Sequence, residues 1–462
     1  MAEAAALVHG LAVTGASVVR ALQRHGYTVI VTDDRIDEAK RELATSLGVE
    51  LRAAPVDWSE MLESVAIVSP APGVPETHPL ITTAHHRGVP VVSEIELAYR
   101  WEQHRAPALG GPRPILAITG TDGKTTTTEL TVAILSAAGL RTAALGNTDV
   151  PLVDALDASG EDALDAFVVE CTSFRLAWTQ HFRADAAAWL NLAPDHLNWH
   201  ASMATYEAAK ARIWQLQRPG DVAIGFVDDP IVMARLAVAP GRHVTFGLTR
   251  ADYRTERGWL VGPVGRIAEV ASMGRRLPHD VTNALAASAL VLETGLASTD
   301  AIATALATFR APPHRLEPVG DAEGVSWFND SKATTPHAAS AAIRAFDSLV
   351  LIAGGSRKGV DLSPMGAEPR RVRAVVAIGE AAPDIHAVFD ERTTVVDAGS
   401  MADAVERAAA LARPGDAVVL SPGCASFDWY SGYPARGDDF RRLVEAHIAA
   451  ATKRINMTAD RQ

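Results

Sequence analysis

The sequence predicts an α/β protein of three domains, each built around a parallel sheet. Its 462 residues correspond to three domains at roughly 150 residues each. Short apolar runs alternate with Ala- and Leu-rich helical stretches along the whole chain, and this order is typical of parallel sheets with helical crossovers. The apolar runs are continuous rather than alternating, which indicates strands that are covered on both faces.

Two stretches rich in proline and glycine divide the chain. HRAPALGGPR lies between Gln103 and Pro114, and APPHR occupies residues 311–315. Because proline ends helices and such stretches are common linkers, we expect APPHR to act as a hinge between two domains. The expected domains are a Rossmann-like domain over 1–105, a central P-loop-type domain over 106–311 and a second Rossmann-like domain over 312–462.

Composition and charge exclude several classes of protein. Apolar residues make up 48% of the chain and charged residues 21%, which excludes a disordered chain, a collagen and a coiled coil. The net charge of −12 disfavours nucleic acid and anionic lipid as partners. Cys171 and Cys424 lack the spacing of a metal site, and no apolar run is long enough to span a membrane. We expect a monomer in the cytoplasm.

Nine apolar runs are expected to form strands. Ligands of parallel α/β sheets bind at the carboxyl ends of the strands, so the residues after each run are candidate site residues. The runs are Thr28–Asp33, Val65–Pro70 and Val89–Glu94 in the first domain, Pro114–Thr119, Ala166–Glu170 and Ala186–Leu192 in the second, and Ser348–Gly355, Ala374–Glu380 and Asp416–Gly423 in the third.

The first domain carries a partial dinucleotide fingerprint. GLAVTG (Gly10–Gly15) opens a helical stretch, and TDDR (Thr32–Arg35) follows the next expected strand. Gly15 occupies the third glycine position of GxGxxG, but Ala12 replaces the second glycine. The spacing of the acidic residues suits a nucleotide other than NAD, although a nicotinamide oxidoreductase remains an alternative.

The clearest motif is a glycine-rich loop between the strand at Pro114–Thr119 and a helical stretch. Glycines let backbone N–H groups approach phosphate oxygens, the lysine reaches terminal phosphates, and the hydroxyl binds magnesium. The loop is shorter than GxxxxGK[ST], because Ile118 stands at the first glycine position. A plain glycine turn and a non-catalytic ATPase switch are the alternatives. The loop residues are Gly120, Thr121, Asp122, Gly123, Lys124, Thr125 and Thr126.

Three further residues of the second domain are candidates for metal chemistry. Glu170 ends an expected strand, where a carboxylate can bind magnesium. His196 follows another strand in NLAPDHLNWH and is a possible metal ligand. Lys210 lies in the amphipathic stretch TYEAAKARIW, and composition alone predicts that it is a solvated helix lysine.

The third domain offers loops suited to anionic groups. Arg315 can pair with a phosphate, and Asp330 with a ribose hydroxyl. The loops GGSRKGVD (Gly354–Asp361) and SPGCASFDWYSGYPARGDDF (Ser421–Phe440) combine glycines with cationic and hydroxyl side chains after expected strands. These loops predict recognition of a substrate that bears a carboxylate, and the alternative for each is a loop without function.

Together these motifs resemble the Mur ligase family over nearly the whole chain. Within the family, NDSKATTP and the carboxyl-terminal loop are most similar to the members that add D-glutamate. The motifs occur in the family's order and at its spacings: GTDGKTTT, VVECTSF, NLAPDHLNWH, YEAAKARIW, PHDVTNALAA, PHRLEPV, NDSKATTP, GGSRKG and SPGCASFDWY.

The resemblance implies roles around ATP and two magnesium ions. Lys124 and Thr125 hold the phosphates and a magnesium ion, Glu170 binds the first ion and His196 the second. Lys210 is carbamylated by CO2 and becomes an acidic group near the second ion, which reverses the interpretation from composition. Asn283 faces adenine, while Asp280 replaces an asparagine of many relatives and is given no role. The catalytic residues are Lys124, Glu170, His196 and Lys210, the metal ligands Thr125, Glu170, His196 and Lys210, and the remaining ATP contacts Asn283, Arg315 and Asp330.

The resemblance also implies the substrates and the reaction. The implied enzyme activates the carboxylate of UDP-N-acetylmuramoyl-L-alanine with ATP and joins it to D-glutamate. A ligase that adds another amino acid, or a folylpolyglutamate synthase, is the alternative within the family. The residues implied at the UDP-sugar peptide are Thr14, Asp33, Asp34, Arg35 and Asn147, and those implied at D-glutamate are Lys332, Thr334, Lys358, Ser426 and Phe427.

Overall fold

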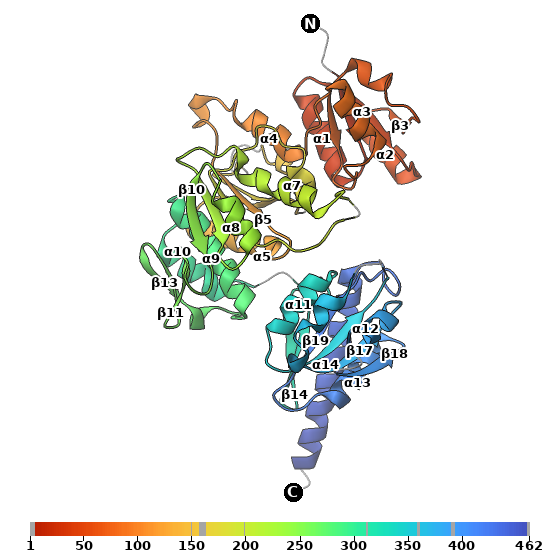
Figure 1. Cartoon of the computed structure of the whole chain (residues 1–462), viewed down its shortest axis with the longest axis vertical. Coiled ribbons are helices and arrows are strands. Elements are labelled where there is room, and N and C mark those ends of the chain that lie inside the picture. Colours follow the sequence, from red (N-terminus) through yellow and green to blue (C-terminus); the bar gives the residue numbers. More distant parts are fainter. Residues whose placement is uncertain are drawn as a thin grey trace. The chain divides into compact units, whose positions relative to one another are not determined.

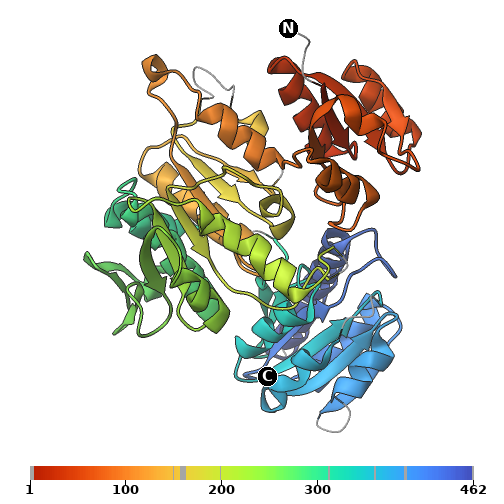
Figure 2. The ribbon, with the colours of Figure 1, turned by 45° about the horizontal axis from the view of Figure 1, so that its top comes forward.

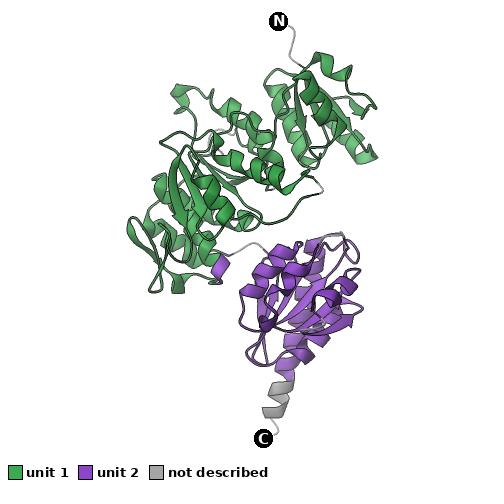
Figure 3. Ribbon diagram, viewed as in Figure 1, with its two compact units in different colours: residues 1–276, 280–309 green, residues 277–279, 310–462 purple. Residues whose placement is uncertain are grey.

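The computed structural model of the protein describes residues 5–148, 150–156, 163–197, 199–310, 313–357, 361–389 and 393–459. The chain divides into two compact units (Figure 3). Unit 1 comprises Met1–Arg276 and Asp280–Phe309, and unit 2 comprises Leu277–His279 and Arg310–Gln462. No helix among the described residues is long and apolar enough to cross a membrane.

The amino-terminal part of unit 1, coloured red to orange in Figure 1, contains a four-stranded parallel sheet. Its strand order is β3-β2-β1-β4. This order reverses direction at β1, as in doubly wound folds. The strands are β1 (Ala5–His9), β2 (Thr28–Asp33), β3 (Leu51–Ala53) and β4 (Val65–Pro70), and the helices are α1 (Val13–Arg24), α2 (Glu38–Ser46), α3 (Pro79–Arg87) and α4 (Glu94–Glu102).

The expected strand at Val89–Glu94 is wrong. Val91 forms only an isolated parallel bridge with Val68, and Glu94 begins α4. Ser93 is the N-cap residue of this helix, and acidic residues follow it in the first turn. Ser93 makes no side-chain cap hydrogen bond, so the acidic residues of the first turn are the local signal that favours a helix start. This signal outweighs the short apolar run before it.

The central part of unit 1 is a six-stranded parallel sheet in the order β10-β9-β8-β5-β7-β6. Strand β5 lies between β7 and β8, so the chain changes direction across the sheet beside β5. Ligands bind at such switch points. The strands are β5 (Ile115–Thr119), β6 (Ala144–Gly146), β7 (Phe167–Glu170), β8 (Ala186–Trp189), β9 (Val222–Phe226) and β10 (Arg242–Phe246).

Both faces of the central sheet are covered by helices (Figure 2). Successive residues of β5 belong to different cores: Ala117 packs with Trp214 of α7, whereas Ile118 packs in the core that contains Leu130 of α5. The continuous apolar pattern of this strand therefore reflects burial on both sides. The helices of this part are α5 (Lys124–Ala137), α6 (Ser173–Leu176), α7 (Met203–Gln215), α8 (Pro230–Leu236), α9 (Pro278–Glu293) and α10 (Thr299–Thr308).

A small antiparallel sheet follows β10 in the chain. Its order is β11-β12-β13, and each strand pairs with the next through a short turn. Leu260 and Ile267 from this sheet join the core beneath α9 and α10. The strands are β11 (Arg254–Glu256), β12 (Trp259–Gly262) and β13 (Gly265–Glu269).

Unit 2 is a six-stranded sheet in the order β14-β15-β19-β16-β17-β18, in which only β14 runs antiparallel to its neighbour. The carboxyl ends of β15, β19 and β16 therefore lie side by side. The strands are β14 (Glu317–Ala322), β15 (Val325–Asn329), β16 (Leu349–Gly354), β17 (Val372–Ile378), β18 (Thr394–Ala398) and β19 (Ala417–Gly423), and the helices are α11 (Pro336–Arg344), α12 (Ala382–Phe389), α13 (Met401–Leu411) and α14 (Tyr433–Ala459).

The predicted α/β class with parallel sheets is confirmed. Two expected strands, Thr28–Asp33 and Val65–Pro70, coincide with β2 and β4. The run Ala186–Leu192 is a strand only as far as Trp189, because the chain turns there toward the glycine-rich loop. The expected hinge at 311–315 falls partly on residues 311 and 312, which lie outside the described residues.

Candidate active site

The glycine-rich loop leaves the carboxyl end of β5 and enters α5 at the centre of the sheet. The Lys124 ammonium donates to the backbone carbonyls of Gly120, at 2.9 Å, and Thr121, at 2.7 Å. Gly123 is the N-cap residue of α5 and has a φ of +83°, a left-handed conformation that favours glycine. The amino end of a helix offers unpaired N–H groups and positive potential, which suits a phosphate.

Asn191, which sequence analysis gave no role, holds the loop in place. Its side-chain oxygen accepts hydrogen bonds of 2.9 Å from the backbone N–H groups of both Thr121 and Asp122. Its amide nitrogen donates to the Asp122 carbonyl at 3.2 Å. Asn191 follows β8, so its position after a strand was the available signal in the sequence.

Lys210 is almost completely buried, so its interpretation as a solvated helix lysine is wrong. Its Nζ atom donates to the Gly120 carbonyl at 2.6 Å and lies 4.7 Å from the centre of the Tyr206 ring. Burial holds the pKa of Lys210 well below its usual range, and the Lys124 ammonium lowers it further. A lowered pKa increases the fraction of neutral amine, which is the nucleophilic form of lysine.

His196 lies close to this group of residues. Its ring contacts those of Phe174 and Tyr206, with centroid distances of 4.6 and 6.2 Å. Its backbone is left-handed, with a φ of +56°, and Asp195 accepts a 2.7 Å hydrogen bond from its N–H group. Desolvation lowers the pKa of His196 to about 4, so the imidazole is neutral near pH 7. Neutral imidazole is the form that binds metals.

Glu170 ends β7 next to the loop and is buried. Its Oε1 atom accepts a 2.8 Å hydrogen bond from the Asn147 amide, whereas its Oε2 atom is buried without a hydrogen-bond partner. A buried carboxylate oxygen of this kind is costly unless it pairs with a cation. The arrangement therefore fits a magnesium ligand, since magnesium prefers carboxylate and hydroxyl oxygens.

Arg175, also missed by sequence analysis, lies on the far side of Asn147. Its guanidinium donates to the Asn147 side-chain oxygen at 2.8 Å and to the Thr14 hydroxyl at 3.4 Å. It also forms a buried ion pair with Glu94, at 3.0 Å. The structure thus brings Thr14, Asn147 and Glu170 into one hydrogen-bonded group.

The two acidic residues at the end of β2, Asp33 and Asp34, differ in their surroundings. Asp33 is buried and accepts hydrogen bonds from the Leu11 and Arg35 N–H groups and from Lys40, at 2.7 to 2.9 Å. Burial alone would raise the pKa of Asp33, but these donors outweigh it and lower the pKa. Asp33 therefore stabilises the loop, whereas Asp34 and Arg35 are exposed.

Asp34 faces two histidines. The Nε2 atoms of His9 and His78 lie 3.5 and 3.4 Å from one Asp34 oxygen, and the three ligand atoms lie within 4.8 Å of one another. The Nδ1 atom of His78 accepts a hydrogen bond from the Leu80 N–H group at 3.2 Å. A neutral His78 therefore carries its proton on Nε2, which favours donation to Asp34 over binding of a metal.

The turn before α1 is also suited to an anion. Its N-cap residue, Ala12, provides no side-chain cap, so the first N–H groups of the helix are open to a ligand. A Cβ atom at Gly15 would overlap the Gly10 carbonyl oxygen, which explains the glycine at this position of the fingerprint.

Asn283 of α9 lies against the loop. A Cβ atom at Gly123 would stand 2.8 Å from the Asn283 side-chain oxygen. The structure thus brings the implied adenine contact to the phosphate loop. Asp280, one turn earlier in α9, pairs with Arg275 at 2.5 to 2.8 Å, which accounts for an acidic residue at this position.

In unit 2, Asp330 follows β15 and is buried. Its carboxylate accepts hydrogen bonds from the Leu316 N–H group at 3.0 Å and from the Ser421 hydroxyl at 2.7 Å. Arg315 lies between His314 and Leu316, which have φ values of +63° and +46°. Left-handed backbone at residues other than glycine is strained and concentrates at functional sites.

The residues implied at D-glutamate lie on neighbouring loops of unit 2. The Lys332 ammonium stands 3.9 Å from the centre of the Tyr433 ring, and the Thr334 N–H group donates to the Lys332 carbonyl. Ser426 is buried, whereas Phe427 is 69% exposed and open to a ligand. Lys358 lies outside the described residues.

Arg436 of α14 joins two of these loops and was missed by sequence analysis. It is buried and donates to the hydroxyl and carbonyl of Ser331 and to the carbonyls of Cys424 and Ala425, at 2.9 to 3.2 Å. Burial lowers the pKa of Arg436 to about 10, so it remains charged near pH 7. It therefore fixes the loop after β15 to the loop after β19.

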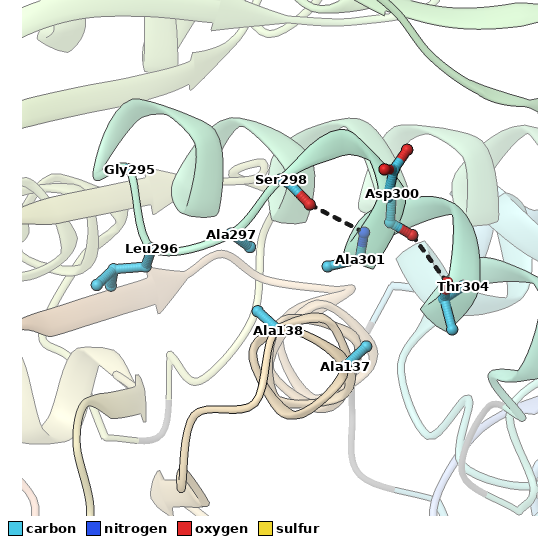
Figure 4. A pocket seen from close by; sticks show the side chains of 9 residues that line it. All are labelled: Ala137, Ala138, Gly295, Leu296, Ala297, Ser298, Asp300, Ala301 and Thr304. Carbon is cyan, nitrogen blue, oxygen red and sulfur yellow. Dashed lines mark hydrogen bonds between the residues drawn. The ribbon is translucent and has the colours of Figure 1, made fainter.

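A cavity of about 560 Å³ lies where the end of α5 meets the start of α10 (Figure 4). It is lined by Ala137 and Ala138 at the end of α5, by Ser298 and Asp300 at the start of α10, and by neighbouring residues that include Leu296. The length of α5 separates it from Gly123 by about 20 Å. None of the predicted site residues lines this cavity.

Sequence similarity to known proteins extends over nearly the whole chain. A MurD-like Mur ligase N-terminal domain matches residues 4–93, a Mur ligase middle domain 118–291 and a Mur ligase glutamate ligase domain 314–424. The chain is 43% identical over 460 residues to UDP-N-acetylmuramoylalanine–D-glutamate ligase of Frankia casuarinae, covering 95% of this chain and 93% of that one. It is 39% identical over 476 residues to the ligase of the same name from Streptomyces coelicolor, with coverages of 95% and 97%.

Solved structures share the fold at low sequence identity. Pseudomurein peptide ligase type C from Methanothermus fervidus aligns with a TM-score of 0.59 and 17% identity, over 96% of this chain and 100% of that one. The predicted three-domain α/β architecture is confirmed. Because its domains match in order and its relatives exceed 30% identity along nearly its full length, the chain belongs to the Mur ligase family.

Proposed function

We propose that the protein is an ATP-dependent amide ligase that adds D-glutamate to UDP-N-acetylmuramoyl-L-alanine in the synthesis of peptidoglycan precursors. The observation that carries the proposal is the meeting of Lys124 and Lys210 at the Gly120 carbonyl. Two amino groups at one backbone oxygen, beside a buried carboxylate with an unpaired oxygen, form a site for phosphates and cations. The relatives named as D-glutamate ligases support the choice of amino acid.

The phosphate loop is the proposed ATP site. The N–H groups of Gly120–Thr126 surround the phosphates, Lys124 neutralises their charge, and Asn283 contacts adenine. The position of Asn283 against Gly123 supports this role. Arg315 and Asp330 are the proposed contacts to phosphate and ribose from unit 2, and the strained backbone around Arg315 supports its role.

Two magnesium ions are proposed, the first held by Glu170 and Thr125 and the second by His196 and a carbamylated Lys210. Magnesium supplies positive charge to the phosphate oxygens when it is bound. The unpaired Glu170 oxygen supports the first site. The lowered pKa values of Lys210 and His196 support the second, because a neutral amine reacts with CO2 and a neutral imidazole binds metal.

The UDP-sugar peptide is proposed to bind at the amino-terminal sheet. The open N-terminus of α1 suits the diphosphate, and Thr14, Asp34, Arg35 and Asn147 are the proposed contacts. Asp33 holds the loop that presents its two neighbours.

D-glutamate is proposed to bind to unit 2. Lys332 and Lys358 pair with its carboxylates, while Thr334, Ser426 and Phe427 shape the site. The adjacency of β15, β19 and β16 supports a common site, since the loops that bear these residues follow those strands. We further propose that the enzyme acts as a monomer in the cytoplasm.

The proposed reaction has two chemical steps. A carboxylate repels a nucleophile, so an oxygen of the L-alanine carboxylate first takes the γ-phosphoryl group of ATP, giving an acyl phosphate and ADP. The amine nitrogen of D-glutamate then attacks the carbonyl carbon and loses a proton. The C–O bond to phosphate breaks, and the amide and inorganic phosphate are released. Negative charge gathers on oxygens throughout, so positioning and electrostatic stabilisation by Lys124 dominate catalysis.

The test is phosphate release by the purified protein with ATP, magnesium and UDP-N-acetylmuramoyl-L-alanine across a panel of amino acids. We expect release that requires D-glutamate and a product heavier by one glutamate residue. Release with a different amino acid would keep the mechanism but overturn the D-glutamate site. A protein that binds ATP and turns over with none of the amino acids would instead be a nucleotide switch.

A further inference from the structure

We propose that Arg175 is a positioning residue that orients Glu170 through Asn147 and thereby links the proposed metal site to the amino-terminal sheet. The proposal rests on the proposed function only in taking Glu170 as a metal ligand. Arg175 lies in α6, three residues after the Thr172 N-cap, and it carries none of the roles implied by the motifs.

A continuous chain of hydrogen bonds supports the proposal. The Arg175 guanidinium donates to the Asn147 oxygen at 2.8 Å, and the Asn147 amide nitrogen donates to Glu170 Oε1 at 2.8 Å. The same guanidinium reaches the Thr14 hydroxyl at 3.4 Å. One side chain therefore contacts both the first turn of α1 and the residue that holds Glu170.

The chemistry of the two end groups fixes the direction of the Asn147 amide. A guanidinium only donates, and a carboxylate only accepts. Asn147 must therefore turn its oxygen to Arg175 and its NH2 group to Glu170. Without Arg175, the Asn147 oxygen would lose its donor, and only the bond to Glu170 would hold the amide, so Asn147 would fix the Glu170 carboxylate less firmly.

Glu94 holds the Arg175 guanidinium in place. The side chains of Arg175 and Glu94 are 4% and 1% exposed, and their closest N···O distance is 3.0 Å. Removal of one partner from a buried pair leaves an uncompensated charge. Loss of this ion pair would lower the stability of the fold. The experiment must therefore separate this loss of stability from the effect of Arg175 on the orientation of Glu170.

The orientation of Glu170 determines where its Oε2 atom points, and this atom has no hydrogen-bond partner. Because Oε1 is held by Asn147, the buried Oε2 atom is the one left for a cation. Partners that orient a metal ligand typically contribute 10- to 100-fold to metal affinity. Arg175 contacts Glu170 only through Asn147, so we expect it to contribute about 10-fold to metal affinity.

The experiment compares Arg175→Met with the double variant Arg175→Met/Glu94→Gln. The double variant removes both buried charges, so thermal stability should recover toward the wild-type value. Binding of Mn²⁺ is titrated by electron paramagnetic resonance with a saturating non-hydrolysable ATP analogue present. We expect the dissociation constant for Mn²⁺ to be raised about 10-fold in both variants.

A second buried pair in unit 1 provides a matched control. Arg113 and Glu102 are 6% and 2% exposed and lie 2.7 Å apart. Arg113 also contacts the Leu156 carbonyl and the Phe167 ring, and neither residue belongs to the proposed site. Arg113→Met/Glu102→Gln should leave the dissociation constant for Mn²⁺ within twofold of the wild type. When Asn147→Ala is already present, Arg175 can no longer act through Asn147. Adding Arg175→Met/Glu94→Gln should then raise the dissociation constant for Mn²⁺ by no more than a further twofold.

Two outcomes would overturn the proposal. Recovery of both stability and Mn²⁺ affinity in the double variant would show that the Arg175–Glu94 pair is only structural. A wild-type protein that binds no Mn²⁺ would remove Glu170 as a metal ligand. The titration needs neither substrate, so its result is independent of whether D-glutamate is the amino acid used.

Discussion

At the scale of single residues, the site is a group of charges around one carbonyl oxygen. Lys124 is half-buried and Lys210 almost fully buried, and both donate to Gly120. Burial lowers the pKa of Lys210, and the Lys124 ammonium lowers it further because it disfavours a second positive charge beside it. The two lysines share the Gly120 carbonyl as an acceptor, but burial lowers the pKa of Lys210, whereas Lys124 is proposed to neutralise the phosphates.

Replacement of Lys124 tests the phosphate loop. Lys124→Ala should lower kcat by about 100- to 1000-fold, because one preorganised charge at the transferred phosphoryl group is lost. Thermal unfolding should stay close to the wild type, since the Gly120 carbonyl keeps its hydrogen bond from Lys210. Steady-state phosphate release measures the effect, and near-normal turnover would remove Lys124 from the site.

Replacement of Lys210 tests the proposed carbamate. Lys210→Ala should lose activity, and acetate or formate should restore part of it by supplying the missing acidic group. The Lys124→Ala variant is the control, because a short acid cannot replace a cation. A folded Lys210→Ala variant that binds nucleotide and gains nothing from the acids would count against the carbamate.

At the scale of elements, the junction of β5 and α5 depends on Gly123. Gly123→Ala places a side chain at a φ of +83° and 2.8 Å from Asn283 Oδ1. Gly139, just after the same helix, has a φ of +84° and nothing within 4 Å of its Cβ position. Each alanine should cost about 1–2 kcal/mol through backbone strain.

Comparison of the two variants separates the effect of backbone strain from the effect on the phosphate loop. Gly139→Ala should keep the wild-type affinity for an ATP analogue, whereas Gly123→Ala should lose at least 10-fold because Asn283 must move. Chemical denaturation and nucleotide titration measure the two effects. Equal nucleotide affinity in both variants would contradict the role given to the Gly123–Asn283 contact.

The strands and the phosphate loop could be predicted from the sequence because each is marked by residues that are adjacent in the chain. Apolar runs buried on both faces predict parallel strands, and the loop after β5 is recognisable from its glycines and lysine. The helix start at Glu94 was missed because Val89–Val92 is apolar enough to suggest a strand. The positions of Asn191 and Arg436 depend on which loops the fold brings together, and spacing in the sequence does not contain that information.

Arg175 illustrates the same limit at the site. Its partners Thr14, Glu94 and Asn147 come from three distant segments, and only folding brings them together. The domain boundaries at 105 and 311, the roles of the site residues and the carbamate at Lys210 remain predictions.

At the scale of the whole molecule, buried histidines make stability depend on pH. Burial lowers the pKa of His9, His200 and His314 below the ordinary value, although carboxylates such as Glu76 oppose the shift. The folded protein therefore binds fewer protons than the unfolded chain. This contribution to stability is present above about pH 6.5 and is lost as pH falls through the lower folded pKa values.

We expect the unfolding free energy to be lower at pH 5 than at pH 7.5. Urea unfolding at the two pH values measures the difference for the transitions of both units. His200→Gln should reduce the pH dependence in unit 1, because one group that must take up a proton is gone. Equal stability at the two pH values would contradict this account of the histidines.

The Gly120 carbonyl has a consequence for the heat of nucleotide binding. Lys124 already donates to Gly120 and Thr121, so a phosphate oxygen replaces an existing acceptor and the number of hydrogen bonds hardly changes. Exchange of one hydrogen bond for another has a small net effect. Titration calorimetry should then show that Lys124→Met weakens the ATP analogue mainly through a less favourable entropy, with nearly unchanged enthalpy.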